Sequence, residues 1–290
     1  MKAMRNKYKI MEPWIYLLPC MLLLIAFVYY PFLKTIFLSF TLTNAMGNPI
    51  RFVGLENYAE MIKSPDFINS VVVTLKFVFV TALPTLITGF AMAMLTEVKS
   101  KRNRIFEALF SMPIIISSSA GSIVWMLMLN PSTGVVNYLL GQKSNWFLDK
   151  RFALIAVAVV TVWLSAGFNY IFFIAGLRNM PKDVLESARM DGAGTFRRTF
   201  EIVIPLISST LFFVVFMDLM VFFQTFTQIA ILTKGGPMQA TQVFVYSIYN
   251  NAFVNNRIDT ACTQSVILFV IMLAVTLLQF SFEKKGVYYN

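Results

Sequence analysis

Six long apolar stretches constrain this chain more than any other feature of its sequence. They occupy residues 14–38, 71–96, 108–129, 152–176, 202–232 and 263–282. A helix needs about 20 such residues to cross the hydrocarbon core of a bilayer. Only 13% of the residues are charged, whereas a soluble domain carries about a quarter. The sequence therefore predicts an all-α membrane protein with six transmembrane helices.

Lys and Arg residues near the ends of these stretches predict which way the helices face, because basic residues are retained on the cytoplasmic side. They are densest before the first stretch, between the second and third, and between the fourth and fifth. We expect one transmembrane domain over residues 1–290 with both termini in the cytoplasm. Its cytoplasmic parts are an N-terminal segment (1–13), a loop (178–203) and a tail (283–290). No small-residue cleavage site follows the first stretch, so it is expected to stay as a membrane helix rather than be removed as a signal peptide.

The residue inventory excludes several kinds of chemistry. The sequence has no histidine, and its two cysteines, Cys20 and Cys262, are far apart. Histidine relays and Ser-His catalysis are therefore excluded, and neither a metal site nor a disulfide framework is indicated. The GxxxxGK[ST] phosphate loop of nucleotide hydrolases is also missing. The net charge of +10 lies in short clusters rather than on one face, which argues against nucleic-acid binding.

The loop at residues 178–203, called the polar loop below, is too polar to cross lipid. Its composition predicts a short helix that breaks near Gly192 and Gly194. Its apolar side chains include Leu185, Ala188, Met190 and Phe196. They suit a groove on another protein, with the charged side chains at the rim. The alternative is an ordinary loop whose charges only orient the membrane helices.

The spacing within and after the polar loop matches a known signature. It reads Glu186-Ser187-Ala188, three residues, Gly192, nine residues, Ile202, one residue, Ile204-Pro205. This pattern resembles the "EAA, three, G, nine, I, one, LP" signature of permease subunits of type I ATP-binding-cassette importers. Ser187 and Ile204 are mild departures. The stretches "FVGLENYAEMI" (52–62) and "LTKGGP" (232–237) are similar to the carbohydrate branch, the maltose-type family.

The resemblance implies a division of labour. The chain would be half of a translocation pore, completed by a homologous permease, in a bacterial or archaeal cell membrane. Two separate ATPase subunits would bind ATP and Mg, so this chain would need no cofactor and perform no catalysis. An extracytoplasmic solute-binding protein would deliver a sugar. The polar loop would hold a cytoplasmic coupling helix that docks on the ATPase through Glu186, Ser187, Ala188, Met190, Asp191, Gly192, Ala193 and Arg197.

Asp218 is the one acidic residue deep inside an expected span, where a carboxylate is costly and usually faces a cavity or a partner. Helical periodicity places it on one face with Val221, Phe222 and Thr225. Such a mixture of acceptor, hydroxyl and aromatic groups suits a sugar. The resemblance implies a substrate path through the fourth and fifth spans, at Thr161, Leu164, Ser165, Phe168, Asp218, Val221, Phe222 and Thr225.

Alternatives to the substrate path and to the importer stay open at this point. Asp218 has an alternative role as a packing residue paired with a neighbouring helix. In the fourth span, Ser165 and Gly167 permit close helix approach and Asn169 offers hydrogen bonds. An ion-coupled secondary transporter acting alone is the other class of function, with Asp218 as its coupling group. Within the importer family, glycerol phosphate esters are a second substrate class.

Overall fold

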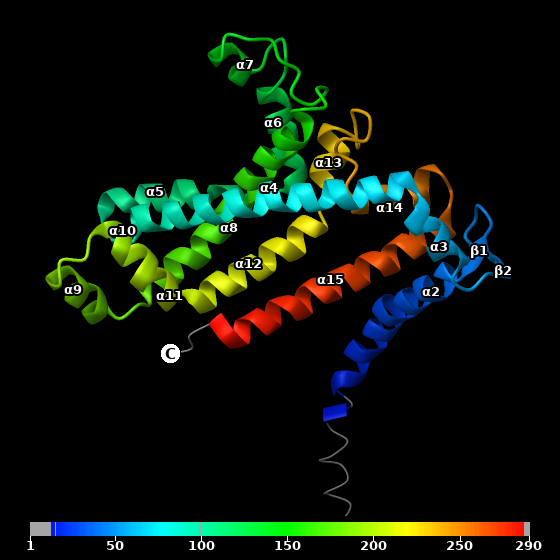
Figure 1. Cartoon of the computed structure of the whole chain (residues 1–290), viewed down its shortest axis with the longest axis horizontal. Helices are drawn as coiled ribbons and strands as arrows, with labels where there is room; N and C mark the ends of the chain where they lie inside the picture. Colours follow the sequence, from blue (N-terminus) through cyan, green and yellow to red (C-terminus); the bar gives the residue numbers. More distant parts are fainter. Residues whose placement is uncertain (1–12, 15, 99, 287–290) are drawn as a thin grey trace, which may run out of the picture. The chain divides into compact units, whose positions relative to one another are not determined.

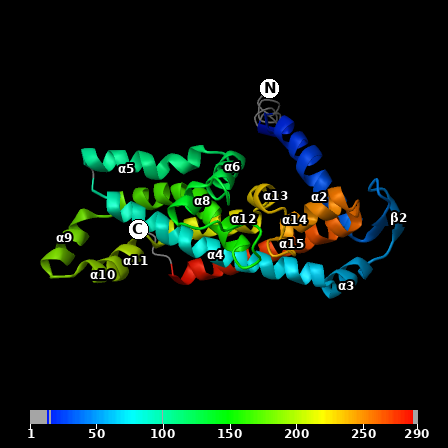
Figure 2. The ribbon, with the colours of Figure 1, turned by 90° about the horizontal axis from the view of Figure 1, so that it is seen from above.

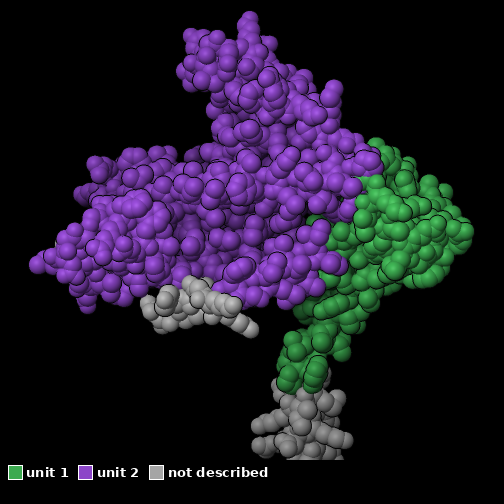
Figure 3. Space-filling model, viewed as in Figure 1, with its two compact units in different colours: residues 1–64, 248–269 green, residues 65–247, 270–290 purple. Residues whose placement is uncertain are grey.

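The computed structural model describes residues 13–286 except 15 and 99, and most of them are helical (Figure 1). The predicted all-α fold is confirmed, with one small β-hairpin added. The cytoplasmic segment expected at 1–13 lies outside the described residues except for its last residue, as do residues 287–290 of the tail. The chain divides into two compact units, shown in Figure 3: residues 1–64 with 248–269, and residues 65–247 with 270–290.

The first unit joins one long apolar helix to a hairpin. Its elements are η1 (Ile25–Tyr29), α2 (Tyr30–Ser39), β1 (Thr41–Thr43), β2 (Pro49–Phe52), α3 (Glu56–Lys63), η4 (Asn250–Val254) and the start of α15 (Ile258–Gly286). β1 and β2 pair antiparallel. The Asn57 amide donates hydrogen bonds of 2.9 and 3.0 Å to the backbone carbonyls of Ser39 and Thr41. The "FVGLENYAEMI" stretch thus fixes the hairpin to the end of α2.

The second unit holds both predicted functional regions. Its elements are α4 (Pro65–Thr96), α5 (Lys101–Ser111), η2 (Met112–Ile115), α6 (Ser118–Met128), α7 (Val135–Leu139), α8 (Ala153–Arg178), α9 (Lys182–Met190), α10 (Thr195–Arg198), η3 (Thr199–Val203), α11 (Ile204–Leu206), α12 (Ser208–Phe223), α13 (Thr227–Leu232), most of α14 (Phe244–Tyr249) and the end of α15. Helices α4 and α8 pack along each other, and α12 packs on both (Figure 2).

A stripe of small residues along α4 explains its close packing on α8. Thr81, Thr85, Gly89 and Ala93 recur every four residues, on one face of the helix, and all are buried. The two threonine hydroxyls donate to carbonyls one turn earlier, at 2.7 Å, which satisfies them inside the core. A Cβ added at Gly89 would lie 2.6 Å from the Cβ of Asn169 on α8. Only glycine therefore permits this approach.

Gly89→Val is expected to destabilise the helix pair strongly. Overpacking a tight core costs about 1–3 kcal/mol, and here the added atoms also meet the backbone of Tyr170. Ala91→Val is the matched control, because Ala91 is exposed two residues further along the same helix. The fraction of monodisperse protein left after heating in detergent measures the effect. Equal heat resistance in the two variants would contradict the close contact of α4 and α8.

Among residues 13–286 that the structure describes, four helices are long and apolar enough to span a membrane: Tyr16–Ser39, α4, α8 and Ile258–Glu283. Each of the predicted stretches at 108–129 and 202–232 contains a bent pair of helices rather than one straight helix. Helices Lys101–Ile115 and Ser118–Met128 meet at 105°, and Thr195–Leu206 meets α12 at 76°. The structure holds up to six spans if each bent pair counts as one.

Local chemistry accounts for the bends. Pro113 lies in η2, the 3₁₀ turn before the first bend, and the Ser117 hydroxyl accepts a hydrogen bond from the backbone N–H of Ala120. A proline and a new N-cap together end one helix and start another. At the second bend, Ile207 leaves helical geometry two residues after Pro205. The predicted fifth stretch ends with a third break, because α12 stops at Phe223 and α13 starts at Thr227.

Candidate functional site

The polar loop contains two short helices, α9 and α10, separated by a tight turn. Gly192 has a φ of +74°, and the backbone N–H of Ala193 donates to the carbonyl of Ala188 at 3.0 Å. A left-handed glycine followed by a bond back to the last helical turn is the Schellman ending of a helix. The predicted break near Gly192 is therefore confirmed, and its physical cause is the glycine.

Apolar side chains protrude from the two short helices. Met190 is 87% exposed and Phe196 is 77% exposed, and the rings of Phe196 and Phe200 lie tilted against each other, 4.5 Å between centroids. Glu186 is exposed on the same helix as Met190. A loop that only carries orienting charges has no need of such side chains, whereas a docking helix does.

Between α9, α10 and η3 the loop forms an open hollow of about 480 Å³. The hollow is lined by Asp183, Val184, Ser187, Ala188, Asp191, Ala193, Arg197, Glu201 and Ile202. Arg197 and Glu201 form an exposed ion pair at 2.7 Å one helical turn apart. Five of the eight residues predicted to contact the ATPase, namely Ser187, Ala188, Asp191, Ala193 and Arg197, therefore share this hollow. Their contact with an ATPase stays a prediction.

The predicted substrate-path residues lie on α8 and around the end of α12. Asp218 is 3% exposed, and its Oδ2 accepts a hydrogen bond of 2.7 Å from the Asn169 amide on α8. The carbonyl oxygen of the same Asn169 side chain, Oδ1, is buried and has no hydrogen-bond partner among the described residues. The pair joins α8 to α12 through a buried side-chain hydrogen bond.

The other predicted path residues divide between buried and open positions. Phe222 and Thr225 are buried with Asp218, but Val221 is 52% exposed. Val221 lies about one turn after Asp218 on α12 but is more open than its neighbours, and Thr225 lies just beyond the end of that helix at Phe223. On α8, Thr161 is buried and bonds back to Val157, whereas Leu164, Ser165 and Phe168 are half-buried.

Asn169 was missing from the predicted site. Its signal in the sequence is a single carboxamide in an otherwise apolar span, which is costly unless it finds a partner. The partner lies 49 residues further along the chain, so only the packing of α8 on α12 reveals it. The substrate role of the predicted path residues stays a prediction.

The sequence model of a family described as "Binding-protein-dependent transport system inner membrane component" matches residues 85–284. The chain belongs to this family. The matched region includes the polar loop, α8 and α12, and so covers both parts of the candidate site. This permease is thus a membrane subunit of a transport system. Binding-protein-dependent transport also argues against the alternative of an ion-coupled transporter acting alone.

Relatives and solved structures extend the likeness over nearly the whole permease. The sn-glycerol-3-phosphate transport system permease protein UgpA of Agrobacterium fabrum is 33% identical over 96% of this chain and 96% of the relative. UgpA of Brucella suis is 34% identical with the same coverage. A chain of the bacterial alginate ABC transporter, solved in complex with an alginate pentasaccharide-bound periplasmic protein, shares the fold with a TM-score of 0.82 at 20% identity, covering 96% and 97% of the two chains.

Proposed function

We propose that this permease forms half of the translocation pore of an ATP-driven carbohydrate importer and that its polar loop docks on a separate ATPase subunit. The exposed Met190 and Phe196 beside the hollow between α9 and α10 carry the proposal. Apolar side chains on a polar helical tip need a protein groove, because neither water nor lipid suits both faces. ATP and Mg would be bound by the ATPase partner. This chain would then change conformation and line the substrate path, and it would not hydrolyse ATP itself.

The polar loop faces the cytoplasm in this proposal, and so do both termini. Within the second unit, the polar loop, the α4–α5 turn and the end of α15 lie toward one end (Figure 1). Phe280 of α15 packs on Phe212 near the start of α12, at 6.0 Å between ring centroids. These three segments are the inner segments expected from Lys and Arg placement. Their gathering at one end supports the orientation in the cell membrane.

The assembly would contain two ATPase subunits, a homologous second permease and an extracytoplasmic solute-binding protein. The family description names dependence on a binding protein. The alginate transporter that shares this fold was solved with a periplasmic protein bound. Alternating access then requires the two permease chains to open the path to one side of the membrane at a time.

The substrate is proposed to be a carbohydrate, with Asp218 as its hydrogen-bond acceptor in the path. A second candidate is sn-glycerol 3-phosphate, which the names of several curated relatives favour. An anion is disfavoured beside Asp218 unless the partner subunit supplies cations, because like charges repel strongly at low dielectric. The two substrates separate cleanly in an uptake assay.

The test is purification of the tagged permease from its own membranes, followed by uptake in proteoliposomes with the co-purified binding protein. We expect an ATPase and a second permease to co-purify, and labelled maltose or glucose to accumulate in a vanadate-sensitive manner. Accumulation of sn-glycerol 3-phosphate without any sugar would identify sn-glycerol 3-phosphate, the second candidate, as the substrate. Uptake by this chain alone, driven by an ion gradient, would contradict the proposal.

A further inference from the structure

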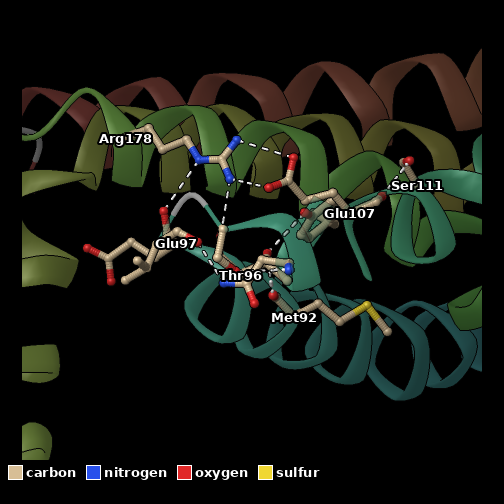
Figure 4. Close-up of polar contacts among 10 residues, drawn as sticks. Met92, Thr96, Glu97, Glu107, Ser111 and Arg178 are labelled. Carbon is tan, nitrogen blue, oxygen red and sulfur yellow. Dashed lines mark hydrogen bonds and ion pairs between the residues drawn. The ribbon is translucent and has the colours of Figure 1, made fainter. Parts of the chain in front are cut away.

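Arg178 ends α8 where the polar loop begins, and its guanidinium reaches two other elements (Figure 4). It forms an ion pair with the Glu107 carboxylate of α5, with one N–O contact of 2.5 Å and a second of 3.5 Å. It also donates to the backbone carbonyl of Thr96, at 3.1 Å, and to that of Glu97, at 3.5 Å. One side chain therefore joins the C-terminal ends of α4 and α8 to the middle of α5.

The chemistry of these contacts favours arginine over other cations. The last carbonyls of α4 have no partners within the helix, and they carry the negative end of its dipole. A planar guanidinium binds such carbonyls along one edge while its other edge takes a carboxylate in fork geometry. Lysine has a single charged nitrogen on a flexible stem and does not span both sets of acceptors. Arg178 thus acts on α4 and α5 together.

Neighbouring contacts make this junction firm. The Thr96 and Tyr170 hydroxyls are 3.0 Å apart, and the Tyr170 ring meets the Phe110 ring edge-on at 5.7 Å. On the far side of α8, a Cβ added at Gly176 would lie 2.8 Å from the Thr210 hydroxyl of α12. The end of α8 is therefore in contact with α4, α5 and α12.

The ion pair of Arg151 with Asp149 is a local contact, and it can be compared with the pair of Arg178 with Glu107. Arg151 binds Asp149 two residues away in the turn before α8, and its side chain is 80% exposed. The Arg178 and Glu107 side chains are 25% and 30% exposed, and 71 residues separate them in sequence. The Arg178–Glu107 pair is shielded from water and holds α8 and α5 together. The Arg151–Asp149 pair is exposed and connects only residues of one turn.

We propose that Arg178 is a positioning residue for energy coupling, which ties the start of the polar loop to the α4–α5 turn so that both move as one body. The proposal rests on the function proposed above, in which the ATPase moves the polar loop. When the ATPase displaces α9 and α10, the displacement is transmitted to α4 and α5 through Arg178. It is transmitted to α8 and α12 through the backbone that connects them to the polar loop. Without Arg178 the loop would move while the α4–α5 turn lagged behind.

The test measures distances between spin labels in the purified complex, with both native cysteines replaced by serine. One pair of labels joins Thr195→Cys in the polar loop to Lys101→Cys at the start of α5; both positions are exposed. A second pair joins Thr195→Cys to Ser132→Cys in the loop between α6 and α7. Distances are recorded without nucleotide and after addition of Mg-ATP and vanadate.

With Arg178 intact, we expect the 195–101 distance to stay constant while the 195–132 distance shifts. In Arg178→Gln the 195–101 distance is expected to shift beyond the width of its original distribution. Arg151→Gln is the matched control and is expected to change neither distance. ATPase activity stimulated by the binding protein should fall roughly fivefold to tenfold in Arg178→Gln alone.

Four outcomes count against parts of the account. A constant 195–101 distance in Arg178→Gln overturns the role of Arg178, as does a shifting distance in the parent complex. If the Arg178→Gln complex is obtained in lower yield but its 195–101 distance is unchanged, Arg178 stabilises the fold and does not transmit movement. This outcome also overturns the proposal. An unchanged 195–132 distance in the parent complex contradicts the proposed function itself, because the polar loop then does not respond to nucleotide.

Discussion

Glu186→Lys is expected to lower ATP-driven uptake about tenfold or more, with normal amounts of the permease in the membrane. Glu186 is exposed on α9 beside the protruding Met190, so the substitution reverses a charge on the proposed docking surface. Like-charge contacts at an interface oppose binding strongly, whereas an exposed side chain contributes little to folding. Uptake and ATPase activity in proteoliposomes, together with immunoblots of the membrane fraction, measure the effect.

Two further variants complete this test. Gly192→Asp is expected to give the same loss, because a φ of +74° strains a residue with a Cβ and disturbs the turn between α9 and α10. Glu60→Lys is the matched control, since Glu60 is an exposed glutamate on α3. Normal coupling of ATPase to uptake in both Glu186→Lys and Gly192→Asp would remove the polar loop from the mechanism.

Asp218→Asn is expected to leave the complex assembled but to lower sugar uptake about tenfold or more, the equivalent of one charged hydrogen bond of about 1.5–3 kcal/mol. The new carboxamide oxygen still accepts the Asn169 hydrogen bond, so the contact between α8 and α12 survives. The other carboxylate oxygen becomes an NH2 group, which can no longer accept a hydrogen bond from a sugar hydroxyl. Complex yield, heat resistance and uptake of labelled sugar are the three measurements.

The leucine variants separate a packing role from a substrate role. Asp218→Leu leaves the buried Asn169 amide without its partner, which is expected to cost about 1–3 kcal/mol of stability in addition to uptake. Adding Asn169→Leu removes both polar groups and is expected to recover part of that stability. If Asp218→Asn retains full uptake while Asp218→Leu fails to assemble, Asp218 is a packing residue and not part of the substrate path.

The sequence alone predicted the regions whose structure depends on local chemistry. The break of the polar loop at Gly192 follows from a single residue type, and the ends of α4 and α8 agree with the predicted stretches to within two residues at Thr96 and Arg178. Hydropathy located the bent segments too. It could not reveal the bends, because the segments that flank Ile207 and Ser117 are mostly apolar on both sides.

Contacts between helices far apart in the chain could not be predicted from the sequence. Asn169 and Asp218 are each polar residues in separate apolar spans, and helical periodicity does not set the register of one span against another. The same holds for Arg178, which composition assigns only to the inner side of the membrane, although it bonds to Glu107 and the end of α4. In both cases the missing information is the packing angle and offset of two helices.

Site-specific photo-crosslinking in intact cells tests the central claim most directly. A photoreactive residue at Phe196, which is 77% exposed on the polar loop, is compared with one at Tyr138, which is 86% exposed on α7. We predict that position 196 crosslinks to a nucleotide-hydrolysing subunit and that position 138 does not. Crosslinking of such a subunit from position 138, or only extracytoplasmic partners from position 196, would contradict the account.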